Sequence, residues 1–157
     1  MNGQDYLENQ VLTAQPQQLH LMVVDGALRF ARKAAQAAEN HHFEQAHFAL
    51  YKSRDLVAEL IGGLDGSHQP EMVEQLKALF VFVYENLNHA DVKQDAGYIQ
   101  NAIKVLSIHR EAWCELIEQL QSTVTEENKM FHTQESLKRP HHIEHSEQAH
   151  QSRSWLT

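Results

Sequence analysis

The chain has 157 residues, the length of one domain, and 42% of them are hydrophobic, which is enough for a single core. Its 13 basic and 21 acidic residues give a formal net charge of −8 without any basic stripe, which argues against nucleic acid and anionic lipid as partners. One cysteine excludes an internal disulfide, no apolar run approaches the ~20 residues that span a bilayer, and the N-terminus lacks a signal-peptide pattern. We therefore expect a cytoplasmic protein with no membrane span.

Residues 1–14 are predicted to form a short N-terminal arm, and the first helix is predicted to follow it. The helix begins at Pro16, because proline has no backbone N–H to leave unpaired at the first helical position. Apolar residues then recur at steps of three and four from Leu19 to Ala38, the spacing of one helical face. We expect Gly26 to let a neighbouring helix approach this one closely.

Three further helices are predicted over residues 43–64, from Pro70 to about 90, and over 96–121. In each segment the apolar residues again recur at steps of three and four. A glycine pair at 62–63 frays the end of the second helix, and short polar connections separate the others. No run alternates apolar and polar residues with the period of a strand.

Four amphipathic segments with short polar connections predict an all-α fold, an antiparallel up-down-up-down four-helix bundle. We place the bundle at residues 15–121. The remaining segment, 122–157, is polar and rich in histidine, and Pro140 interrupts any helix through it. We therefore expect a flexible tail there.

The chemistry-bearing residues do not predict an enzyme. His141, Glu144 and His145 have the H-x-x-E-H spacing of some zinc proteases, but they follow Pro140 in a segment with no core to hold them. A histidine next to a basic residue, as at His109, is also a weak match to phosphotransfer bundles. We expect no catalytic residues, no metal and no cofactor.

Two helices carry more apolar residues than one bundle-facing stripe of about 100° requires. The surplus residues are Leu21, Val24, Leu28, Val81, Phe82 and Tyr84. One interpretation is a central helix with additional neighbours. The other is a groove that receives an amphipathic segment of a partner protein, and these six residues are our candidates for binding it.

Two blocks of residues occur in an order seen in a known family. The first reads VLTAQPQQL at 11–19 and LMVVDGALRF at 21–30, and the second reads NLNHADVKQD at 86–95, with REAW at 110–113. Together they resemble the flagellin export chaperones of the FliS family across residues 6–120. The chain departs from the family at Gln15, where a serine is usual, and at Val23 and Val24, where Leu-Tyr is usual.

The resemblance implies a non-enzymatic cytosolic chaperone for type III secretion. Its client, the protein it binds, would be flagellin, held by the disordered C-terminal segment until it reaches the flagellar export apparatus. Four apolar side chains of the arm would then cover part of the groove as a lid in the absence of client. They are Tyr6, Leu7, Val11 and Leu12. A bundle adaptor or regulator with a different client is the alternative, and a homodimer of the client-free protein is left open.

Overall fold

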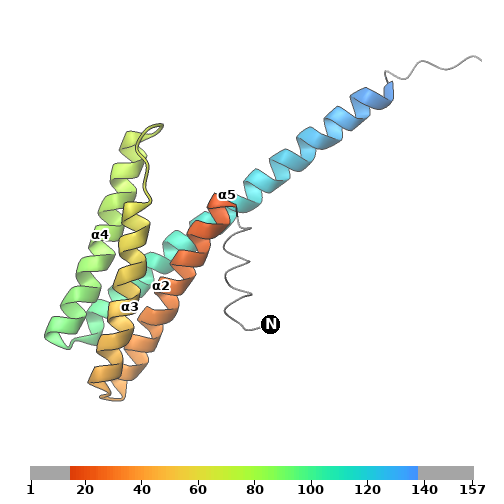
Figure 1. Cartoon of the computed structure of the whole chain (residues 1–157). Coiled ribbons are helices and arrows are strands. Elements are labelled where there is room, and N and C mark those ends of the chain that lie inside the picture. Colours follow the sequence, from red (N-terminus) through yellow and green to blue (C-terminus); the bar gives the residue numbers. More distant parts are fainter. Residues whose placement is uncertain (1–14, 138–157) are drawn as a thin grey trace, which may run out of the picture. The chain divides into compact units, whose positions relative to one another are not determined.

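The computed structural model describes the backbone of residues 15–137 and the side chains of residues 15–130. This part of the chain consists of four α-helices and contains no strand (Figure 1). The helices are α2 (Pro16–Glu39), α3 (Phe43–Gly62), α4 (Pro70–Lys93) and α5 (Ala96–Leu137). The predicted all-α fold is confirmed.

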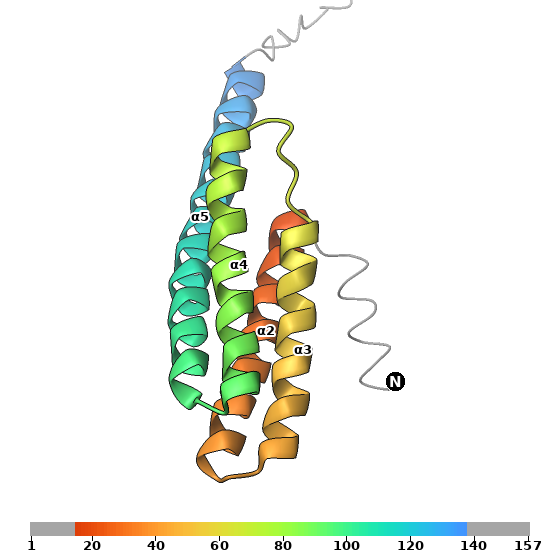
Figure 2. The same cartoon turned by 90° about the vertical axis from the view of Figure 1, so that its left-hand side faces the viewer.

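The connections of the bundle alternate between its two ends. Figures 1 and 2 show the α2–α3 and α4–α5 connections at one end and the longer α3–α4 connection at the other. Successive helices therefore run in opposite directions, which agrees with the predicted up-down-up-down order.

The last helix is longer than predicted. It was expected to end at Gln121, and α5 continues to Leu137. Residues 121–130 are all exposed, so burial does not hold this stretch in place. Its sequence contains neither glycine nor proline, and a lack of core contacts alone does not end a helix. Contacts between residues divide the chain into two compact units, with the boundary between Leu120 and Gln121. The bundle belongs to the first unit. The predicted arm, residues 1–14, lies outside the described residues, as does the tail from residue 138 onward.

Helices α2 and α3 pack closely against each other, and small residues meet at their contact. A Cβ atom added at Gly26 would lie 3.0 Å from Leu56 Cδ1, so the glycine permits the close approach that its sequence position predicted. One residue further along α2, the carbonyl of Ala27 accepts a hydrogen bond of 2.9 Å from Ser53 Oγ, and Ser53 is fully buried. Alanines fill most of the remaining α2 face.

The core draws on all four helices. Its largest fully buried apolar side chains are Val24, Leu28, Val57, Phe80, Val83, Leu87, Ile99 and Leu106. Burying a side chain of this size stabilises the fold by about 1.5–3 kcal/mol relative to exposure. The core therefore fixes the rotation of each helix, and with it the residues that face outward.

Candidate client-binding surface

Polar contacts join α2 to α5 along one side of the bundle. The indole Nε1 of Trp113 donates a 2.9 Å hydrogen bond to the carbonyl of Gln17. Two turns further along α2, the carboxylate of Asp25 accepts a hydrogen bond from the guanidinium of Arg110. These contacts hold α5 in place by its side chains and set which α5 residues face outward. We call this set of contacts, with the histidine pair described next, the α2–α5 seam.

Two histidines lie at the centre of the α2–α5 seam. The Nε2 atoms of His20 and His109 are 2.8 Å apart, so one ring donates and the other accepts. The His109 ring packs edge-on against buried Phe80, with centroids 4.9 Å apart, and His20 lies 4.2 Å from the Trp113 ring. Burial, followed by the charge of His109, lowers the pKa of His20 to about 4, and burial also lowers the pKa of His109. Both rings are therefore neutral at pH 7.

A buried histidine does not suit a phosphotransfer site, which needs an exposed one. His109 is only 7% exposed and its Nε2 is already hydrogen-bonded. Its neighbour Arg110 is paired with Asp25. The phosphotransfer interpretation of this histidine is therefore not supported.

Two of the six candidate binding residues are core residues, so this part of the prediction is wrong. Val24 is 0% and Leu28 is 1% exposed. Helix α2 contacts α3 through Ala27 and α5 through Asp25, and a helix with two neighbours buries a wider arc than one stripe. The central-helix interpretation therefore applies to α2.

Phe82 remains on the surface, at 48% exposure, on the side of α4 that faces α5. Asn86, one turn further along, donates to the carbonyl of Phe82 and accepts a 3.4 Å hydrogen bond from Asn101 of α5. Ile108 follows Asn101 on the same face of α5 at helical spacing and is 58% exposed. The α4–α5 face of the bundle thus presents uncovered apolar side chains. Ile108 was missed from the sequence because it lies off the main stripe of its helix.

Tyr84 lies on the opposite edge of α4, at 39% exposure. Asn88, one turn further along, accepts a 2.8 Å hydrogen bond from Arg54 of α3, which places this edge beside α3. Val81 shares the edge and is partly buried. The α4 candidates therefore lie on the two sides of the exposed face of α4. Leu21 is partly buried on α2 and lies one turn before Asp25, beside α5. The structure does not gather the candidates into one groove.

Two groups of residues considered in the sequence analysis lie outside the described residues. The first group is the lid, Tyr6, Leu7, Val11 and Leu12. The second is the H-x-x-E-H match, His141, Glu144 and His145. Within the described part of the chain, no three histidine, cysteine or acidic side chains are grouped so as to hold a metal ion.

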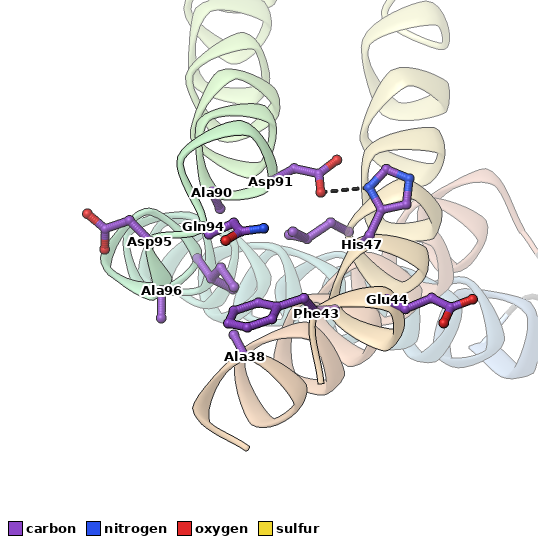
Figure 3. A pocket seen from close by; sticks show the side chains of 12 residues that line it. Ala38, Phe43, Glu44, His47, Ala90, Asp91, Gln94, Asp95 and Ala96 are labelled. Carbon is purple, nitrogen blue, oxygen red and sulfur yellow. Dashed lines mark hydrogen bonds and ion pairs between the residues drawn. The ribbon is translucent and has the colours of Figure 1, made fainter. Parts of the chain in front are cut away.

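A pocket of about 330 Å³ lies where the α2–α3 and α4–α5 connections meet. Figure 3 shows His47 pointing at Asp91 on one wall, while Glu44 and Asp95 point away from the pocket. His47 Nδ1 lies 2.7 Å from one Asp91 oxygen, and Arg54 lies 3.1 Å from the other. The floor is made of small and aliphatic side chains. Among the acidic and histidine side chains that line the pocket, His47 and Asp91 contact each other while Glu44 and Asp95 point outward, so these four do not converge on one point.

Two exposed aromatic residues on α3 were also missed from the sequence. Phe48 is 60% and Tyr51 is 49% exposed. Both fall between the apolar positions of the α3 stripe, so a search for large apolar residues off the stripe would have found them.

None of the helices in the described part is long and apolar enough to cross a membrane.

Comparison with known proteins finds a family model that covers the bundle and relatives that carry the same family name. The model of the family described as "Flagellar protein FliS" matches residues 1–120. A flagellar secretion chaperone FliS of Bacillus subtilis (strain 168) is 33% identical over 113 residues, covering 72% of this chain and 84% of that protein. A flagellar secretion chaperone FliS of Campylobacter jejuni is 30% identical over 111 residues, covering 71% and 87% of the two chains.

Proposed function

This chain belongs to the FliS family of flagellar proteins, and we propose that it is a flagellar secretion chaperone that binds the C-terminal segment of flagellin. In this proposal it works in the cytosol, keeps new flagellin from polymerising early and passes it to the flagellar export apparatus. Covering the apolar faces of the client is sufficient for this task. The proposal therefore includes no catalytic step and no cofactor.

The uncovered apolar side chains on the α4–α5 face are the observation that carries this proposal. Phe82 and Ile108 lie beside the α4–α5 contact, and Tyr84 lies on the other side of the exposed face of α4. Each is large, and each keeps more than a third of its surface in water. An amphipathic helix laid along α4 would bury them at about 25 cal/mol per Å² of apolar surface.

Release of the client also follows from this mode of binding. A disordered segment that folds on binding loses about 2–5 kcal/mol of the gross interaction energy to ordering. The net affinity is therefore moderate even when much apolar surface is covered. The client can leave the chaperone at the export apparatus without hydrolysis of a nucleotide.

The N-terminal arm is proposed to compete with the client. Tyr6, Leu7, Val11 and Leu12 would cover part of the same surface in the free protein. Deleting residues 1–12 should then raise client affinity and speed amide exchange around Phe82. Unchanged affinity and unchanged exchange would contradict the lid. In the absence of client the same surface could pair two copies, which sedimentation of the free protein tests.

The proposed function is tested by calorimetry and circular dichroism with a C-terminal flagellin peptide. We expect binding at micromolar concentrations or below, with a gain in helicity, because the peptide folds as it binds. Phe82→Ser should weaken binding by about tenfold or more, whereas Phe48→Ser, at a phenylalanine of α3 that is more exposed still, should not. No binding at tens of micromolar would instead favour an adaptor with a different client.

A further inference from the structure

Aromatic rings and positive charge occur together on the outer face of α2 and α3, although the chain as a whole is acidic. A groove of about 790 Å³ lies between these helices next to the loop that connects them. We call it the α2–α3 groove. Phe30 of α2 and Phe48 of α3 line it, and no lining residue comes from α4 or α5. Its volume is within the range of ligand-binding clefts.

Three cations lie over the rings of this face. The guanidinium of Arg29 is 5.2 Å and Lys33 Nζ is 5.6 Å from the centroid of Phe30. Lys52 Nζ lies 5.5 Å from the ring of Phe48 and 5.7 Å from that of Tyr51. These contacts hold the three charges beside the apolar rings, where they stay accessible to a partner.

The lining of the groove carries one lysine, Lys33, and one acid, Glu44, and the positive excess comes from Arg29 and Lys52 over the rings that border it. Among the described residues that line the groove, Glu44 is the one acidic side chain. The formal charge of the whole chain is −8. A segment with many negative charges would be repelled by the net charge of the chain and attracted by the cations at this groove.

We propose that the α2–α3 groove binds an acidic amphipathic segment of a partner protein. Apolar side chains of that segment would lie between Phe30 and Phe48. Its carboxylates would pair with Arg29, Lys33 and Lys52. A nucleic acid fits less well, because three cations on an acidic molecule offer few phosphate contacts. This inference does not depend on the identity of the client that binds at α4.

The test uses the full chain and two labelled peptides, followed by fluorescence anisotropy. Both peptides carry Phe and Leu at helical spacing, and the remaining positions are Glu in one and Lys in the other. We expect the Glu peptide to bind about tenfold or more tightly than the Lys peptide, with an advantage that falls as salt is added. Equal affinities for the two peptides would overturn the proposal.

Charge reversal locates the site. Lys33→Glu combined with Lys52→Glu should lower affinity for the Glu peptide by about tenfold or more, because two attractive charges become repulsive. Lys77→Glu combined with Lys104→Glu, at exposed lysines of α4 and α5, is the matched control and should change affinity by less than about twofold. A control variant as damaging as the variant at Lys33 and Lys52 would overturn the proposal.

A reciprocal pair of variants separates this inference from the proposed function. Phe48→Ser should abolish Glu-peptide binding and leave flagellin-peptide binding intact, and Phe82→Ser should do the reverse. Failure of the flagellin peptide to bind would count against the proposed function alone. Displacement of the Glu peptide by the flagellin peptide would show one shared surface and overturn a separate groove. So would Glu-peptide binding that appears only after residues 1–12 are deleted, since the arm would then be the occupant.

Discussion

The His20–His109 pair should make the bundle lose stability as the pH falls from 7 toward 5. His20 has a pKa of about 4 in the folded chain against 6.5 as the ordinary value. The unfolded chain therefore binds more protons between these two pH values, so the free energy of unfolding rises with pH across this range and falls on acidification. The pair has room for one proton between the two Nε2 atoms, 2.8 Å apart, so a second proton breaks the contact.

The magnitude follows from the size of the shift. A shift from 6.5 to about 4 corresponds to about 3 kcal/mol at about 1.36 kcal/mol per unit. Solvent reaches part of the His20 ring and screens its charge, so we expect a loss of about 1 kcal/mol between pH 7 and pH 5. The lowered pKa of His109 acts in the same direction.

Urea unfolding followed by circular dichroism at pH 7 and pH 5 measures this loss. The comparison variant is His20→Gln, whose amide can still hydrogen-bond to His109 but does not titrate. Its stability should change less with pH than that of the original chain, although it starts from a lower value at pH 7. If the free energy of unfolding of the two proteins changed equally with pH, His20 would not be the cause of the acid destabilisation.

Three further predictions concern packing and charge. Leu28→Ala should lower the free energy of unfolding by about 2–5 kcal/mol in urea titrations, because it leaves a cavity in the core, and it should not weaken client binding by the folded protein. Gly26→Val should cost about 1–3 kcal/mol by the same measurement, because even a Cβ atom at this position would lie 3.0 Å from Leu56 and the valine methyls reach further. Asp91→Ala should lower the thermal midpoint, since it leaves the largely buried Arg54 without its carboxylate, and a double change with Arg54→Met should recover part of the loss.

The helix starts could be predicted from sequence because they depend on local chemistry. Pro16 and Pro70 each stand at the first residue of a helix, where a missing N–H has no cost. The end of α5 could not be predicted in the same way. We inferred an end near Gln121 from the loss of apolar residues, but an exposed helix needs only residues that tolerate helical geometry.

The exposure of the candidate binding residues was predicted only in part, for a reason that lies in helix packing. Apolar residues beyond the main stripe of a helix can be buried in a second contact or left exposed as a free surface. The sequence of one helix does not distinguish these two outcomes. On α2 the surplus, Val24 and Leu28, lies within the core that the four helices share. On α4 the surplus, Phe82 and Tyr84, is left exposed. The neighbours of each helix decide the outcome, and those become visible only once the bundle is assembled.

The contrast between the two sides of α2 has a consequence for how the bundle opens. Gly26 packs against Leu56 of α3 and the Ala27 carbonyl accepts a hydrogen bond from buried Ser53, so separating α2 from α3 would expose core surface. The α2–α5 seam consists of side-chain hydrogen bonds, which can exchange for water one at a time. Native-state hydrogen exchange should therefore show the stretch of α5 around Arg110 and Trp113 opening before the α2–α3 hairpin, which would be the last part of the chain to exchange.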